Sequence, residues 1–135
     1  MKEVVLLLAL LLFNFFDAFG DGLRDDGRKT FSKAFEMLMI TALYLPVLVV
    51  TGKPAWYEIG MFVGSFILIR YAIFDYTYNG VRGLGAYFIG KTSLTDRFWR
   101  WFFNKTGFPK THWFSWTRII ALILGAGLIG VWELI

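Results

Sequence analysis

Four long apolar stretches constrain this 135-residue chain more than any other feature of its sequence. A helix needs about 20 mostly apolar residues, within a range of about 17–25, to cross a bilayer. A lone strand would leave its backbone groups unpaired in lipid, so each stretch is expected to be helical. The sequence therefore predicts an all-α polytopic membrane protein with a single transmembrane domain over 1–135. Its four predicted transmembrane helices are residues 4–20, 31–51, 56–78 and 117–135.

The composition excludes several other classes of protein. Hydrophobic residues make up 57% of the chain and charged residues 18%, whereas soluble domains average about 45–50% and about 25%. Aromatic residues, at 20%, exclude an intrinsically disordered chain, because disordered segments contain few of them. The chain has no cysteine, which excludes disulfides and thiolate metal sites. Its single histidine, His112, excludes a multi-histidine metal site.

The distribution of Lys and Arg predicts the orientation in the membrane. Eleven of these residues lie in or beside the connections that follow the first and third apolar stretches, and only Lys2 and Lys53 lie on the opposite side. The positive-inside rule therefore predicts a multi-pass protein of the cell membrane, with both basic connections in the cytoplasm and both termini outside the cell. A competing interpretation takes residues 1–20 as a cleavable secretory signal, which would leave three spans.

A short internal repeat divides the chain into two similar halves. Residues 16–24 align without a gap on residues 74–82, in the pattern F-D-x3-[DN]-G-[LV]-R. Each copy lies at the end of an apolar stretch, within a helical hairpin at about 3–52 or about 56–135. Two hairpins in series share one orientation across the membrane. The pattern therefore predicts two parallel-repeat hairpins, related by an axis near the membrane normal.

Each copy of the repeat places its polar side chains at positions i, i+4 and i+7, which form one stripe on a helix. Charged groups near the bilayer core normally face the bundle interior, so the two stripes are expected to meet at the cytoplasmic ends of their helices. Arg70 and Glu36 are placed to extend this cluster. The six stripe residues are Asp17, Asp21 and Arg24 in the first copy and Asp75, Asn79 and Arg82 in the second.

Two interpretations of these six residues are open. In the first, the three carboxylates bind a divalent cation such as Mg²⁺, while the two arginines and the asparagine bind a phospholipid headgroup. In the second, the cross-hairpin ion pairs Asp17–Arg82 and Asp75–Arg24 lock the packing of a non-enzymatic, holin-like or accessory membrane subunit. The headgroup site of the first interpretation would be either catalytic or merely binding. The sequence identifies no catalytic residue and contains no Ser/His/Asp arrangement and no P-loop.

The connection between the third and fourth stretches contains a predicted amphipathic interfacial helix. Ser93 followed by Asp96 is an acidic form of the capping box, which starts a helix over 94–105. Aromatic side chains occupy one face of this helix, and Arg97 and Arg100 occupy the other. It is expected to lie flat on the cytoplasmic leaflet with its arginines toward anionic headgroups. Membrane lipids are therefore the expected partners, and nucleic acid is not, because the rings are better placed in the bilayer.

Small residues in two of the stretches predict close helix packing. Gly60 and Gly64 form a G-x-x-x-G pattern, and Ala126 and Gly130 form a pair of small residues with the same spacing. Such patterns let helix backbones approach closely in membranes. They are expected to serve contacts inside the bundle, and a homo-oligomer through Gly60 and Gly64 is the alternative.

The second half of the chain carries a longer pattern of residues. It runs F-D-x2-Y-N-x2-R-G from Phe74 to Gly83 and Y-x-I-G-x-T-S-x2-D from Tyr87 to Asp96. This pattern resembles the signature of uncharacterised small four-helix membrane proteins of bacteria and their phages, and the resemblance implies the fold but no activity. A looser similarity, of architecture alone, is to the lipocone superfamily of four-helix membrane proteins. It implies polar residues that act on lipid headgroups near one membrane face.

Overall fold

Five helices make up the described part of the chain. The computed structural model describes residues 2–49, 54–91 and 94–131. The helices are α1 (Lys2–Asp25), α2 (Lys29–Val49), α3 (Trp56–Val81), α4 (Leu94–Thr106) and α5 (Lys110–Gly130). No strand occurs in these ranges, so the predicted all-α class is confirmed.

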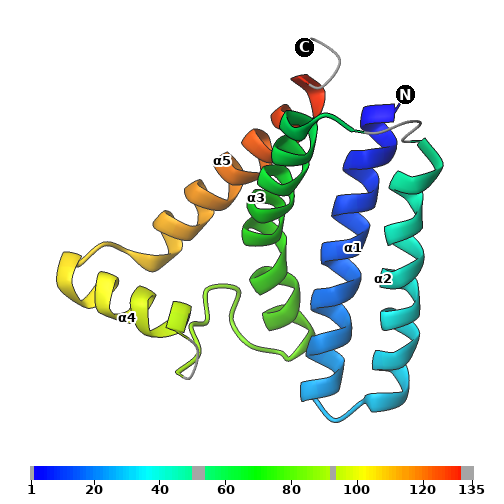
Figure 1. Ribbon diagram of the computed structural model, residues 1–135. Coiled ribbons are helices and arrows are strands. Elements are labelled where there is room, and N and C mark those ends of the chain that lie inside the picture. The colour runs from blue at the N-terminus through cyan, green and yellow to red at the C-terminus, as the bar shows by residue number, and fades with distance from the viewer. Residues whose placement is uncertain (1, 50–53, 92–93, 132–135) are drawn as a thin grey trace.

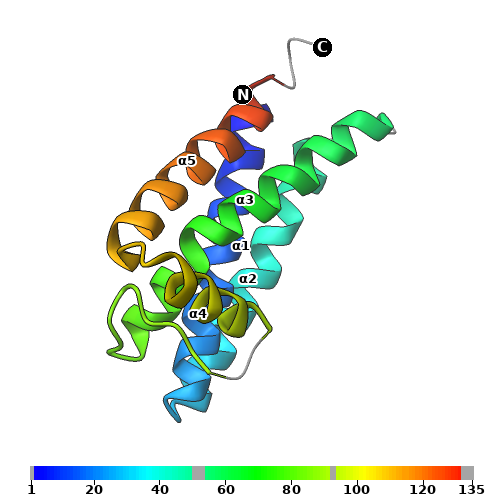
Figure 2. The ribbon, with the colours of Figure 1, turned by 90° about the vertical axis from the view of Figure 1, so that its left-hand side faces the viewer.

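The helix α1 lies between two neighbours in the bundle. α2 runs antiparallel along one side of it, and α3 packs against another side (Figure 1). α5 runs antiparallel to α3 and also touches α1. α1 begins and α5 ends at the same end of the bundle, whereas α4 lies toward the opposite end and extends away from α1 and α2 (Figure 1, Figure 2). The polar ends of α1 and α3 are therefore brought side by side.

Three of the helices, α1, α3 and α5, are long and apolar enough to cross a membrane. Among the described residues α2 does not join them, so the four-span count stays a prediction. α5 begins at Lys110, and the prediction that this helix begins at 117 is wrong. The aromatic segment before 117 continues the helix because Trp113 and Phe114 pack on α4.

The helix predicted over 94–105 is confirmed as α4. Its predicted cap, Ser93, lies outside the described residues. α4 ends at Thr106 and is followed by Gly107, whose φ of +69° is a left-handed conformation that glycine adopts without strain. Gly83, with φ of +66°, follows the end of α3 in a similar way. These two turns direct the chain out of α3 into the loop that leads to α4, and then from α4 back toward α3 as α5.

Apolar and polar side chains are buried together between α1, α3 and α5. Leu10, Ile69 and Ile129 belong to the apolar core, and Asn14 and Ser65 are buried completely beside it. Many large apolar side chains face outward at the same time. This distribution is typical of helices surrounded by lipid, where small and polar residues mediate helix contacts and apolar residues need no shielding.

α3 and α5 approach most closely at Gly125. The Ser65 hydroxyl donates a hydrogen bond to the Gly125 carbonyl oxygen at 2.7 Å. A Cβ atom on Gly125 would lie 2.9 Å from Cγ1 of Ile69 and 3.3 Å from Cβ of Leu68. The sequence analysis expected the small-residue contact of this helix at Ala126 and Gly130, but Gly130 makes no such contact inside the bundle, because a Cβ there would meet nothing within 4 Å.

The G-x-x-x-G pattern of α3 is used inside the bundle at one of its two glycines. A Cβ on Gly64 would lie 3.3 Å from Cδ1 of Leu128 on α5. A Cβ on Gly60 would meet nothing within 4 Å. Gly64 therefore serves an internal contact as expected, and a homo-oligomer through Gly60 and Gly64 stays a prediction.

Candidate functional site

The polar side chains of α3 face two different neighbours. Arg70 and Asp75 are five residues apart, which turns them by about 140° around the helix axis. Arg70 contacts Asp17 of α1, whereas the ion-pair partner of Asp75 is Arg118 of α5. α3 therefore separates the polar residues into a group that joins it to α1 and a group that faces α4 and α5.

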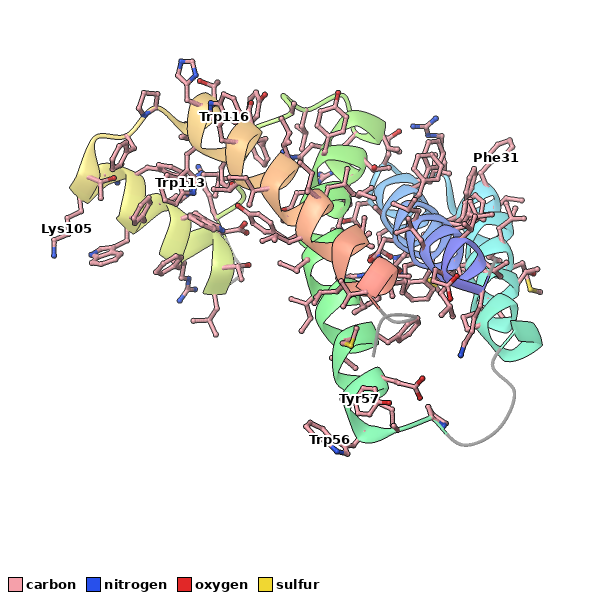
Figure 3. All side chains as sticks on the ribbon, turned by 90° about the horizontal axis from the view of Figure 1, so that it is seen from above. Phe31, Trp56, Tyr57, Lys105, Trp113 and Trp116 are labelled. Atoms are coloured by element: carbon pink, nitrogen blue, oxygen red, sulfur yellow. The ribbon has the colours of Figure 1, made fainter. Side chains whose placement is uncertain are left out.

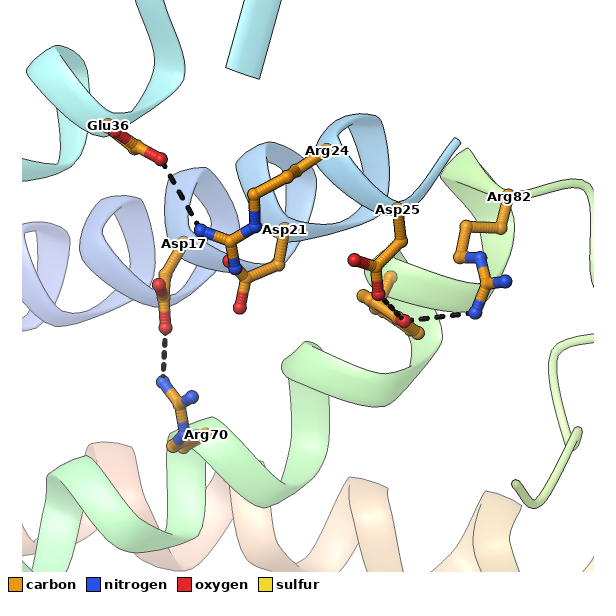
Figure 4. Close-up of polar contacts among 8 residues, drawn as sticks. Asp17, Asp21, Arg24, Asp25, Glu36, Arg70 and Arg82 are labelled. Carbon is orange, nitrogen blue, oxygen red and sulfur yellow. Dashed lines mark hydrogen bonds and ion pairs between the residues drawn. The ribbon is translucent and has the colours of Figure 1, made fainter. Parts of the chain in front are cut away.

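The first group is centred on an ion pair between α1 and α3. Arg70 Nη1 lies 2.6 Å from Asp17 Oδ2 (Figure 4). The Arg70 guanidinium also lies 4.1 Å from the centre of the Phe74 ring. The side chain of Asp17 is 21% exposed and that of Arg70 is 37% exposed. Because each charge has a partner of opposite sign, the pair joins the two apolar helices without leaving an isolated charge between them.

A second polar connection joins the ends of the same two helices. Arg82 Nη1 donates to the Tyr78 hydroxyl oxygen at 3.0 Å, and the Tyr78 hydroxyl donates to the carboxylate of Asp25 (Figure 4). The backbones are close here, since a Cβ on Gly22 would lie 2.9 Å from Cβ of Val81. The glycine of the first repeat copy therefore permits the approach of α1 to α3.

The predicted cross-hairpin pairs Asp17–Arg82 and Asp75–Arg24 are wrong. Arg24 pairs instead with Asp21 of its own helix and lies 3.6 Å from Glu36 of α2. The i, i+4, i+7 spacing placed each stripe on one face of its helix but did not fix which neighbour that face meets. The two stripes do not converge because Asp75 faces away from α1.

The second group lines a cavity of about 400 Å³, here named the α3–α5 cavity. It lies between the last turns of α3, the loop over 82–91, the first turns of α4 and the first half of α5. Aromatic rings form much of its wall. Its charged lining residues are Asp75, Arg82, Asp96 and Arg118.

Arg118 is the deepest charge of this cavity, and its side chain is 10% exposed. Its Nη1 donates to the Ala86 carbonyl oxygen at 3.1 Å, and its Nη2 lies 4.0 Å from Asp75 Oδ2. Its Nε is buried without a hydrogen-bond partner, and its guanidinium lies 4.9 Å from the centre of the Phe114 ring. Because Nη2 meets Asp75 only at 4.0 Å, beyond hydrogen-bond distance, this guanidinium retains a donor for an anion.

The sequence analysis counted Arg118 only as a cytoplasmic charge and did not predict its place in the site. Starting α5 at 117 put this arginine at a helix end, where arginine is common. Since α5 begins at Lys110, Arg118 lies more than two turns inside an apolar helix. An arginine at such a position is a functional candidate in a membrane protein, but the signal depends on where α5 begins, which the sequence did not reveal.

Side chains of α3 and α4, together with Arg118 of α5, hold the loop that closes the cavity. Asn79 of α3 donates from Nδ2 to the Phe88 carbonyl oxygen at 3.2 Å. Arg100 of α4 donates to the carbonyl oxygens of Gly90 at 2.6 Å and Ile89 at 2.9 Å. Arg100 thus uses two of its donors for loop carbonyl oxygens while its side chain stays exposed, and its predicted orientation toward headgroups stays a prediction. Asn79 still lines the cavity, but its amide supports the loop.

Aromatic packing fixes α4 against α5. Phe103 and Phe114 are buried with their ring centres 5.2 Å apart, and Trp99 lies 5.2 Å from Phe114. Trp113 lies between α5 and α4, with its ring 5.0 Å from Phe102, whereas Lys105 lies at the far end of α4 (Figure 3). This cluster sets the position of the α4 side of the cavity.

The three carboxylates predicted to share a metal ion are not brought together. Asp17 pairs with Arg70, Asp21 with Arg24, and Asp75 faces α5. Within residues 2–49, 54–91 and 94–131, no group of three or more His, Cys, Asp or Glu side chains is placed to hold a metal ion. The donor set does not fit the Mg²⁺ site considered from the sequence, so no role of the cavity is assigned to a metal.

Comparison of the chain with protein-family models, with curated proteins and with solved structures finds no match. The resemblance to small four-helix membrane proteins therefore stays a prediction. What the cavity binds has to follow from the chemistry of its own side chains.

Proposed function

We propose that this chain is a multi-pass membrane protein whose α3–α5 cavity binds the phosphate of a lipid headgroup. The observation that carries the proposal is the buried guanidinium of Arg118, which lines the cavity and whose Nη2 meets Asp75 only at 4.0 Å. Arginine offers a planar array of donors that matches the geometry of a phosphate. Arg82, exposed at the rim of the same cavity, supplies a second guanidinium.

The position of the cavity agrees with the depth of lipid headgroups. It lies where the apolar helix α3 ends and α5 begins, which is the level at which a membrane span leaves the hydrocarbon. α4 lies at the same end of the bundle with Phe98 and Trp101 more than half exposed (Figure 1). The nitrogen of Lys105 lies 5.1 Å from the Trp101 ring. Exposed rings beside a basic side chain favour an interfacial position for α4.

We extend the proposal to four spans with both termini outside and the cavity on the cytoplasmic side. α2 supports this because it runs antiparallel along α1 over most of its length (Figure 1). At the opposite end, Trp56 and Tyr57 are exposed at the start of α3, as expected for an aromatic belt at the outer interface.

Single cysteines test the orientation, because the natural chain contains none. Lys53→Cys is expected to react with a membrane-impermeant maleimide only from outside the cell. Lys110→Cys is expected to react only in inside-out vesicles. Reaction of both positions from the same side would contradict the proposed topology.

A second candidate function is that of a structural or accessory membrane subunit. The arrangement of the first repeat copy favours it, because Asp17, Asp21 and Arg24 are all engaged in ion pairs outside the cavity. In that case the polar residues stabilise helix packing and the cavity has no ligand. The two candidates differ in whether a change at Arg118 affects lipid binding.

Replacing Arg118 by glutamine tests the headgroup proposal. The variant removes the charge from the cavity, and a lost charge-assisted hydrogen bond is worth about 1.5–3 kcal/mol. We therefore expect phospholipids to bind at least about tenfold more weakly, measured by lipid titration of the detergent-solubilised protein in native mass spectrometry. Arg118→Lys keeps the positive charge and is expected to lose less affinity.

Arg28→Gln is the matched control for this experiment. Arg28 is an exposed arginine that pairs with Asp26 at 2.8 Å and does not line the cavity. Its replacement is expected to leave lipid affinity unchanged. If Arg118→Gln binds phospholipids as the natural chain does, the structural subunit becomes the better description.

A further inference from the structure

The charged side chains of the α3–α5 cavity balance one another. Asp75 and Asp96 contribute two carboxylates, and Arg82 and Arg118 contribute two guanidiniums. From this balance we infer that the preferred ligand is a zwitterion, the phosphate ester of a primary amino alcohol, as in an ethanolamine phospholipid. The inference rests on the proposed binding of a headgroup phosphate and adds the second half of the headgroup.

Asp75 and Arg118 retain bonding capacity toward such a ligand. Their closest charged atoms are 4.0 Å apart, which is too far for a direct hydrogen bond. The Asp75 side chain is 61% exposed, and none of the hydrogen bonds found in the described ranges of the chain ends on its carboxylate. An ammonium and a phosphate can therefore each add a partner where the two protein groups now meet only at a distance.

The second carboxylate is brought to the cavity wall by a glycine. A Cβ on Gly90 would lie 2.5 Å from Oδ2 of Asp96, so any side chain at this position would displace the carboxylate. Gly90 belongs to the loop whose carbonyl oxygens are held by Arg100. Asp96 thus lines the cavity from α4, whereas Asp75 lines it from α3.

Charge selects between the common classes of headgroup. A headgroup that carries only negative charge would gain from the two arginines but would be repelled by the two carboxylates. A primary ammonium offers three hydrogen-bond donors, from which the exposed carboxylate of Asp75 can accept, whereas a quaternary ammonium offers none. Rings of Phe74, Trp99 and Phe114 line the same cavity and reduce its contact with water, which strengthens these interactions.

The size of the cavity is compatible with this ligand. Its volume of about 400 Å³ lies within the range of about 300–1,000 Å³ that is usual for small-molecule sites. The same chemistry has two possible sources, a phospholipid of the surrounding leaflet or a soluble amino-alcohol phosphate. Both are included as separate arms of the experiment.

The test compares lipids that share acyl chains and differ in headgroup. The full chain in detergent is titrated with phosphatidylethanolamine, phosphatidylcholine and phosphatidylglycerol, and each dissociation constant is measured by native mass spectrometry. Phosphatidylethanolamine is expected to bind about tenfold more tightly than the other two, which corresponds to about 1.4 kcal/mol. Competition by soluble phosphoethanolamine would identify the soluble ester as a source, and its failure would identify the membrane lipid.

Asp75→Asn is the decisive variant, because it removes one negative charge at nearly constant shape. It is expected to weaken the binding of phosphatidylethanolamine by about tenfold and to strengthen the binding of phosphatidylglycerol, so that the preference between the two lipids is lost or reversed. Asp75→Glu is expected to restore the natural order. Asp21→Asn is the matched control, since Asp21 lies outside the cavity, and it should change neither affinity.

Two results would overturn the inference in different ways. Equal affinities for the three lipids, unchanged by Asp75→Asn but reduced by Arg118→Gln, would rule out a preference for a zwitterionic headgroup. The proposed phosphate site would remain. Affinities that respond to neither variant would remove the headgroup site itself. Melting temperatures of all variants, measured in the same detergent, separate a loss of ligand from a loss of fold.

Discussion

Replacing Gly125 by leucine is expected to force α3 and α5 apart and to destabilise the protein by about 1–3 kcal/mol or more. A Cβ alone would lie 2.9 Å from Cγ1 of Ile69 and 3.3 Å from the carbonyl oxygen of Ser65. Ile69 is completely buried, so its side chain has little room to yield. The hydrogen bond from Ser65 to the Gly125 carbonyl would also be lost as the helices separate.

Gly127→Leu is the control for this prediction. Gly127 lies in the same helix two residues further on, and a Cβ there would meet nothing within 4 Å. Both variants gain the same side chain and the same helix propensity. A melting temperature in detergent that falls for Gly125→Leu alone supports the close contact, and equal melting temperatures would contradict it.

The second large effect is expected at Asp17. Asp17→Leu leaves the Arg70 guanidinium without its partner between two apolar helices. An unpaired arginine costs about 2.5–3.5 kcal/mol at the centre of a membrane helix, and somewhat less here because Arg70 lies past the middle of α3, toward the proposed interface. We therefore expect a loss of about 2 kcal/mol in the free energy of unfolding, measured by titration with a denaturing detergent.

A double-variant cycle separates the ion pair from other effects of the substitution. In Asp17→Leu with Arg70→Leu both charges are absent, and the double variant is expected to regain much of the stability lost by the single one. Asp21→Asn is the comparison on the same helix, where the more exposed pair with Arg24 is worth about 0–1 kcal/mol. Additive losses in the double variant would show that Asp17 and Arg70 do not interact.

The helices of this protein were largely predictable because apolar runs of this length specify helices without reference to other parts of the chain. The helix at 94–105 was also predictable, since its own charges and rings define its two faces. The start of α5 could not be predicted. Residues 110–116 have the aromatic composition of a membrane interface, and only their packing on Phe102 and Phe103 of α4 shows that they belong to the helix.

The partners of the polar residues could be predicted less well than the residues themselves. Asp17 faces a neighbouring helix, as expected of the stripe residues, but the expectation that the two stripes meet is wrong at Asp75, because spacing along one helix gives no information on the rotation of its neighbours. Asp17 meets Arg70 and not Arg82 because α3 turns a different face to α1. Arg118 comes from a helix outside both repeat copies, so no comparison of the two copies could have placed it in the cavity.

The ion pair between α1 and α3 has a consequence for how such a chain enters a membrane. Asp17 precedes Arg70 by 53 residues, so Asp17 is synthesised first. When α3 is inserted, the carboxylate that pairs with its arginine is therefore already present in α1. In the proposed membrane arrangement, the order of these charges thus favours assembly in the direction of synthesis. A permuted chain that began with α3 would have to insert its arginine before any partner existed.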